Sequence, residues 1–194
     1  MHRRHALWIL MLCFVPLLAA CGHPWKTVVE AAPNPFYAKG RFAVIPVTFN
    51  YLQVGDSSEA EWMADKDGEQ RASWAEDKGG INERFTAVLV EAAASEGLSV
   101  VRATGPADAP FLIRANVTYF EPGIFTGFFN KNTVLKMTIQ ITDPSGRVLD
   151  EILVERMSPA SLTNPSSGGR ARDAAAQVGR VTAQYLLYRT RGES

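Results

Sequence analysis

The sequence contains few of the side chains on which nucleophilic and metal chemistry usually depend. Its 194 residues include two cysteines and three histidines, and all five lie in the first 23 positions: Cys13, Cys21, His2, His5 and His23. Residues 24–194 therefore cannot supply a disulfide, a thiol nucleophile, a catalytic histidine or a His-rich metal site. We predict no catalytic residue, no metal site and no cofactor, and the chain is not expected to be an enzyme.

The sequence also has no excess of positive or negative charge. Twenty Lys and Arg residues balance twenty Asp and Glu residues. If residues 1–20 are removed, Arg3 and Arg4 leave with them and no acidic residue does, so 18 basic and 20 acidic residues remain. A balance this close to neutral disfavours a nucleic-acid partner.

The N-terminal segment carries the most specific pattern. Arg3 and Arg4 precede an apolar run from Ala6 to Ala20. A basic start, a short apolar run and small residues at its end are typical of a secretory signal peptide. The run is shorter than the roughly 20 residues that a membrane-spanning helix needs. We therefore predict that residues 1–20 are a cleaved signal, in preference to an uncleaved anchor.

The sequence Leu18-Ala19-Ala20-Cys21 resembles the bacterial lipobox. The resemblance implies that Cys21 is the lipidation site, acylated on its sulfur and at the new N-terminus with chains such as palmitate. Several acyl chains together attach a protein stably to a membrane. Gly22, where enterobacterial lipoproteins retained in the inner membrane carry Asp, implies a lipid-anchored protein of the cell outer membrane that faces the periplasm.

Composition divides the mature chain into a tether and one domain. Residues 21–40 contain Pro24, Pro33 and Pro35 and sustain no periodic pattern, so we expect a lipidated tether there. Residues 41–190 are long enough for a single periplasmic domain with its own core. Residues 50–80 form an acidic excursion from that domain.

Hydrophobic periodicity predicts the elements of this domain. The apolar run 41–49 suits a strand, and Asn82 is the expected N-cap of a helix that ends at Gly97. The pattern then predicts strands at 99–103, 111–119, 135–142 and 148–157, and a final helix with core positions from Ala171 to Tyr185. In 148–157 two registers stay open, with either Val148, Ile152 and Val154 or Leu149, Leu153 and Met157 facing the core.

These elements predict an α+β fold. We expect a single mostly antiparallel sheet of about five strands, with two amphipathic helices packed on one face. The strand Phe-Ala-Val-Ile-Pro-Val (42–47) and the hairpin Thr-Asp-Pro-Ser-Gly-Arg-Val-Leu (142–149) resemble bacterial envelope lipoproteins. That group shares the periplasmic-domain fold of the curli-secretion channel, of penicillin-binding-protein activators and of an exopolysaccharide-export lipoprotein. The resemblance carries over no functional residue other than Cys21.

The connection 119–130 is the strongest candidate for a contact surface. It contains five aromatic residues and Ile124 among glycines. If it is exposed, it would form a patch that binds a partner, another subunit or the membrane surface. The alternative is that it folds back over an open end of the core. The candidate partner-binding residues are Phe120, Ile124, Phe125, Phe128 and Phe129.

Two other clusters favour ordinary structural roles. The acidic stretch from Asp56 to Asp77 lacks the spacing of a calcium loop, so a solvated segment is favoured, with Trp62 and Trp74 packing it against the domain. The segment 166–172 could hold an anion at a helix N-terminus, but flexible loop and solvated arginines are the simpler interpretation.

The sequence thus favours a lipoprotein with a non-catalytic periplasmic domain that binds or scaffolds another cell-envelope component. The alternative is a self-assembling structural subunit of an envelope export or secretion machine. A glycan hydrolase that uses two carboxylates is the least favoured possibility. The expected partners are the membrane, through lipid on Cys21, and an envelope protein or further copies of the chain.

Overall fold

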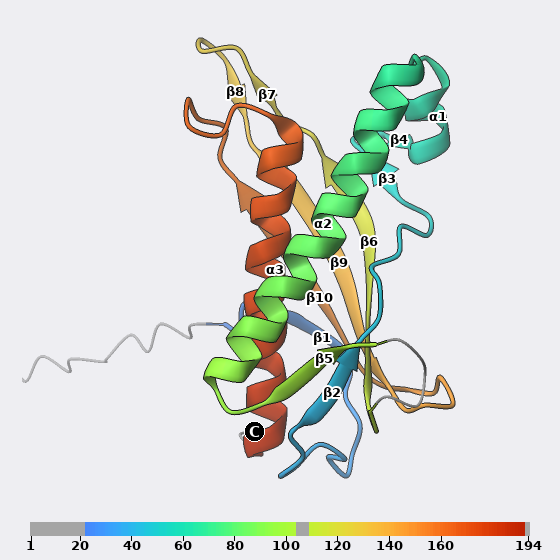
Figure 1. Cartoon of the computed structure of the whole chain (residues 1–194), viewed down its shortest axis with the longest axis vertical. Coiled ribbons are helices and arrows are strands. Elements are labelled where there is room, and N and C mark those ends of the chain that lie inside the picture. Colours follow the sequence, from blue (N-terminus) through green and yellow to red (C-terminus); the bar gives the residue numbers. More distant parts are fainter. Residues whose placement is uncertain (1–21, 104–108, 193–194) are drawn as a thin grey trace, which may run out of the picture.

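The computed structural model describes residues 22–103 and 109–192, which form one large sheet with two long helices across one face (Figure 1). The sheet has eight strands in the order β1-β10-β9-β6-β2-β5, and β3 and β4 continue it beside β6. Its strands are β1 (Lys26–Val29), β2 (Arg41–Val44), β3 (Gln53–Val54), β4 (Ser57–Ser58), β5 (Ser99–Arg102), β6 (Leu112–Glu121), β9 (Thr133–Thr142) and β10 (Val148–Ser158). A separate hairpin comprises β7 (Ile124–Phe125) and β8 (Asn130–Lys131), and the helices are α1 (Glu59–Ala64), α2 (Gly68–Ser95) and α3 (Ser167–Arg191).

The α+β class is confirmed, but the sheet is larger and more mixed than the sequence predicts. It has eight strands where about five are expected, and β2 pairs in parallel with both β5 and β6. The parallel pairing follows from α2, because a helix between β2 and β5 carries the chain back to the same end of the sheet. Strand β2 ends before Pro46, which has no N–H to donate to the sheet. Farther along the chain, β3 pairs in parallel with β6.

Strands β6, β9 and β10 form the antiparallel centre and largely follow the predicted alternation. Ile113, Ala115 and Val117 of β6 are buried beneath the helices. A register shift between Val117 and Tyr119 then turns Phe120, instead of the predicted Tyr119, into the core. The predicted inward residues of β9 are all buried: Leu135, Met137, Ile139 and Ile141.

The open register of β10 is decided by which residues are buried. Ile152 and Val154 face the core, whereas Leu153 and Met157 are exposed on the opposite face. A register shift between Val148 and Asp150 leaves Val148 half-buried at the start of the strand. The same register places Asp150 on the buried face, in line with Ile152 and Val154.

The helix predicted to begin at Asn82 begins much earlier. Helix α2 starts at Gly68, where Asp67 and Gln70 form a reciprocal capping box, and it runs through the region expected to be an excursion. Asn82 lies inside the helix, and its side-chain oxygen accepts a hydrogen bond from the backbone N–H of Val47 at 2.8 Å. Its polar side chain therefore ties α2 to the segment after β2 instead of capping a helix.

The segment predicted to be a tether is part of the domain over its described residues. Strand β1 pairs with β10, Phe36 is fully buried, and Trp25 packs against the core. The backbone N–H of Ala38 also donates to the carbonyl of Thr190 at 3.0 Å. Residues 22–40, hereafter the N-terminal arm, thus add an outer strand to the sheet, and the prediction of a free tether is wrong here.

Candidate functional site

The β7–β8 hairpin is the most exposed apolar feature of the described residues. We use the name aromatic hairpin for residues 122–132, which project beyond the end of the main sheet (Figure 1). The relative exposure is 105% for Phe128, 62% for Phe129 and 47% for Ile124. Phe125 is half-buried at the side of the hairpin. These four candidate contact residues therefore lie together on one protruding element and do not cover the core.

Phe120 is separate from that group and belongs to the core. It is 2% exposed and stacks on Trp74 of α2, with ring centroids 5.2 Å apart. The register shift in β6 that turns it inward is the physical reason. Its inclusion among the partner-binding residues is thus wrong.

Local hydrogen bonds define the shape of the hairpin tip. The hydroxyl of Thr126 accepts from the N–H of Phe129 and donates to the carbonyl of Phe129, each at 3.0 Å. Gly123 and Gly127 have φ angles of 68° and 82°, which glycine adopts without strain. A Cβ at Gly123 would also collide with the backbone of Lys131. The tip is therefore a turn built from its own residues.

Arg170 of α3 holds the base of the aromatic hairpin. It is 1% exposed, and its Nε donates to the hydroxyl of Thr133 at 2.8 Å while its Nη2 donates to the carbonyl of Pro122 at 3.0 Å. The hydroxyl of Thr133 in turn donates to the carbonyl of Pro122 at 2.7 Å. Burial lowers the pKa of Arg170. The prediction that arginines in 166–172 are solvated is thus wrong for Arg170, whereas Arg172 is partly exposed. The guanidinium of Arg170 connects the hairpin to the helical layer.

No charged residue lies between Pro122 and Asn130. The nearest charges flank the tip, where Lys131 pairs with Glu121 at 2.6 Å. The hydrogen bond from Lys131 to Glu121 raises the pKa of Lys131. The hairpin consequently presents an uncharged apolar tip above a neutralised ion pair, which is the pattern of an interface core with a polar rim.

Cys21 lies outside the described residues, and the structure begins beside it at Gly22. Positions 22–25 separate it from β1. His23 stacks on Trp25 with ring centroids 4.6 Å apart, and Trp25 meets the edge of the buried Tyr185 at 5.4 Å. The described residues next to the predicted lipidation site are therefore packed against α3.

A buried charged cluster fixes the N-terminal arm to β10 and α3. Asp150 is fully buried and accepts hydrogen bonds from the N–H of Ala31 at 2.8 Å and from the hydroxyl of Tyr185 at 2.5 Å. Arg189 lies 2.8 Å from Asp150 through Nε and 2.5 Å from Glu30 through Nη1. We call these five residues the arm clasp.

Burial and the hydrogen bond to Asp150 both raise the pKa of Tyr185 above its usual value. The Tyr185 hydroxyl therefore stays protonated and donates to the carboxylate. The sequence pattern does not predict the arm clasp. Its one visible signal is an aspartate in register with the inward residues Ile152 and Val154. The arginine that pairs with it stands 39 residues away and could not be assigned from the pattern.

The acidic stretch from Asp56 to Asp77 is used for helix capping and ion pairing. Glu59 accepts from Trp74 at 2.6 Å and from Lys78 at 2.7 Å, while Asp77 pairs with Arg172 at 3.1 Å. Burial raises the pKa of Asp77, an effect opposed by Arg172. Within 22–103 and 109–192, no three His, Cys, Asp or Glu side chains gather as metal ligands.

The tryptophans of this region pack as expected. The rings of Trp62 and Trp74 meet edge to face at 5.3 Å, and Trp74 is buried. Among the described helices, none is both long and apolar enough to cross a membrane.

Comparison with known proteins gives only distant structural similarities. No protein-family model matches the sequence, and no curated protein matches it significantly. The PelC dodecamer from Paraburkholderia phytofirmans is 12% identical, with a TM-score of 0.44 over 81% of this chain and 96% of that one. Protein XCC0632 from Xanthomonas campestris is 14% identical, with a TM-score of 0.45 over 85% and 94%. Lipoprotein GNA1162 from Neisseria meningitidis is 13% identical, with a TM-score of 0.35 over 74% and 98%. Similarities this distant decide neither the family of this chain nor its function.

Proposed function

We propose that this chain is a lipid-anchored protein of the outer membrane whose non-catalytic periplasmic domain binds another envelope protein through the aromatic hairpin. The observation that carries the proposal is the joint exposure of Ile124, Phe128 and Phe129 on one protruding, uncharged element. Burying a large apolar side chain contributes about 1.5–3 kcal/mol. Aromatic side chains in a cluster of this kind often supply most of the energy of an interface.

The anchor in this proposal is lipid on Cys21, and the packed N-terminal arm changes what such an anchor does. A free tether of 19 residues could extend to roughly 60 Å, whereas the four positions 22–25 extend to about 14 Å at most. The domain would then stay close to the membrane surface. Its orientation would be restricted, because β1 is hydrogen-bonded into the sheet.

Affinity capture from the native membrane tests the proposal. The wild-type chain is compared with a Phe128→Ser/Phe129→Ser variant and with Leu162→Ser as a matched control, since Leu162 is 86% exposed but stands outside the hairpin. We expect an envelope protein that copurifies with wild type and with the control and is lost with the double variant. A set of copurifying proteins that is identical for all three chains would contradict the proposal.

Self-assembly is the second candidate, and it is favoured by the two free edges of the sheet. Strands β1 and β5 end the strand order and pair on one side only among the described residues. Val28, Val29 and Val101 on these strands are exposed. If β1 of one copy paired with β5 of the next, the contact would repeat head to tail and close into a ring or grow as a filament.

Sedimentation of the Cys21→Ser chain separates this candidate from the first. Assembly through the edges predicts oligomers that a proline at Val28 or at Val101 abolishes and that Phe128→Ser leaves intact. A monomer at high protein concentration would count against self-assembly and leave the hairpin proposal standing.

A further inference from the structure

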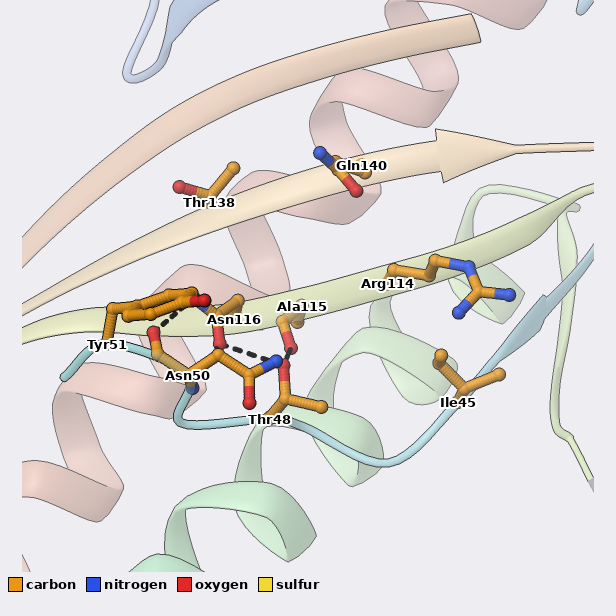
Figure 2. A pocket seen from close by; sticks show the side chains of 9 residues that line it. All are labelled: Ile45, Thr48, Asn50, Tyr51, Arg114, Ala115, Asn116, Thr138 and Gln140. Carbon is orange, nitrogen blue, oxygen red and sulfur yellow. Dashed lines mark hydrogen bonds between the residues drawn. The ribbon is translucent and has the colours of Figure 1, made fainter. Parts of the chain in front are cut away.

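The face of the sheet opposite the helices carries a polar pocket (Figure 2). In this view the helices lie behind the strands, and the side chains of Asn116, Thr138 and Gln140 lie on the open face. The pocket encloses about 380 Å³, which lies within the range of small-molecule sites. Its floor comes from β6 and β9, where Arg114 stands opposite Gln140 and Asn116 opposite Thr138. One wall is the segment between β2 and β3, which includes Tyr51.

The side chain of Asn116 fixes this wall to β6. Its side-chain oxygen accepts from the N–H of Asn50 at 2.8 Å, and its side-chain nitrogen donates to the carbonyl of Asn50 at 3.1 Å. The hydroxyl of Thr48 donates to the same oxygen at 2.8 Å. This amide thus supplements the backbone hydrogen bonds of Thr48 to Ala115 and Val117, which hold the chain beside β6 after Pro46.

Tyr51 sits on this support in a conformation that tyrosine rarely adopts. Its φ angle is 57°, in the left-handed region that costs a residue with a Cβ free energy, and its side chain is 99% exposed. No buried contact compensates for that cost. The strained backbone instead presents an aromatic ring at the edge of the pocket, beside Asn116 (Figure 2).

Arg114 supplies a positive charge at the end of the pocket away from this ring (Figure 2). Its Nε donates to the hydroxyl of Thr142 at 3.3 Å, and it forms no ion pair with a carboxylate of the described residues. Gln140 stands between Arg114 and the nearest carboxylate across the sheet, Glu151, to which it donates at 2.6 Å. Among the described residues, no carboxylate therefore neutralises this guanidinium.

We propose that this pocket binds a glycan that carries a carboxylate. The ring of Tyr51 would stack on the apolar face of one sugar residue, as aromatic rings do with flat apolar surfaces. The hydroxyl of Thr138 and the side-chain oxygen of Gln140 supply groups that hydrogen-bond sugar hydroxyls, whereas the amide of Asn116 is engaged with Thr48 and Asn50. Arg114 would bind the carboxylate through two parallel hydrogen bonds. A pocket open along a sheet face also leaves room for an extended glycan.

Calorimetric titration of the full chain, purified in detergent, tests the proposal with three probes. Hexagalacturonate and N-acetylmuramic acid both carry carboxylates and represent a uronic-acid polymer and a peptidoglycan sugar, and cellohexaose is the neutral control. We expect one of the carboxylated sugars to bind at least tenfold more tightly than cellohexaose. Arg114→Gln should then weaken binding by about tenfold to 100-fold, the loss expected for a hydrogen bond to a charged group.

Tyr51 provides a readout that separates binding from folding. Tyr51→Gly relieves the positive φ angle and should raise the midpoint of thermal unfolding by about 2–4 °C while it weakens sugar binding about threefold to tenfold. Tyr37→Ala, at an exposed tyrosine outside the pocket, should leave sugar binding unchanged. The proposal is overturned if neither carboxylated sugar binds, if cellohexaose binds equally well, or if Tyr51→Gly leaves binding unchanged.

Discussion

Replacement of Asp150 by asparagine is expected to destabilise the protein strongly and to release the N-terminal arm. The carboxylate is fully buried and has three partners, namely Ala31, Tyr185 and Arg189. Asparagine keeps the shape and one acceptor oxygen, but it leaves Arg189 buried beside a neutral amide, with Glu30 as its remaining ion-pair partner. Removing one member of a buried ion pair costs about 3–5 kcal/mol.

The loss of folding free energy in Asp150→Asn can be measured by thermal unfolding followed by circular dichroism. For a domain of this size, 1 kcal/mol corresponds to a shift of about 2–4 °C, so Asp150→Asn should lower the midpoint by about 6–20 °C. Glu83→Gln is the matched control, because Glu83 forms an exposed ion pair with Arg102 that is worth at most about 1 kcal/mol. In the Asp150→Asn variant, trypsin should cleave at Lys26 faster than in wild type, since the arm clasp holds β1 in place. A midpoint within 2 °C of wild type, with Lys26 still protected, would refute the reasoning.

The remaining predictions concern the arm clasp and the hairpin. Tyr185→Phe should cost about 1–3 kcal/mol in urea unfolding at pH 8, since a buried carboxylate loses a donor. The raised pKa of Tyr185 stabilises the fold below the unfolded pKa of about 10, and this contribution is lost as the pH rises further. Wild type should therefore lose more stability between pH 9 and pH 11 than Tyr185→Phe does, and equal losses would contradict this. Gly123→Ala should displace the aromatic hairpin and speed amide hydrogen exchange of residues 124–131, because its Cβ collides with Lys131. Unchanged exchange there would show that the turn tolerates the methyl group.

The central sheet could be predicted because its strands are long and one face is buried. The alternation of polar and apolar residues in β6 and β9 identifies their inward faces directly. The hairpin turn at 143–146 is equally visible, with Asp143 accepting from the N–H groups of Ser145 and Arg147. These features depend on residues close together in the sequence.

The N-terminal arm could not be predicted, because its stabilising contacts are long-range. Ala31 bonds to a residue 119 positions away, and Arg189 reaches Glu30 across 159 positions. Prolines in the arm indicate a loop, and nothing local reveals that Phe36 is buried.

The full length of helix α2 could not be predicted either. Gly80 lowers helix propensity, yet it is accommodated because Arg172 passes so close that a Cβ there would stand 2.7 Å from Cδ of the arginine.

The residues of the aromatic hairpin could be predicted from the sequence, except that Phe120 was wrongly included. The aromatic content of 119–130 identified the exposed group, while a register shift in β6, which no local signal marks, moved Phe120 into the core. The pocket beside Tyr51 could not be predicted from the sequence for a related reason. Its residues lie on three separate segments, and only the paired strands bring Arg114 and Gln140 side by side.

Photocrosslinking in intact cells tests the central proposal most directly. A benzophenone amino acid at Phe128 places the reactive group at the most exposed point of the aromatic hairpin, and the same group at Leu162 is the control. We predict that Phe128 yields a discrete adduct with an envelope protein, that Leu162 does not, and that Phe129→Ser weakens the adduct. No adduct at Phe128, or the same adduct at both positions, would contradict the proposal that the hairpin is the binding surface.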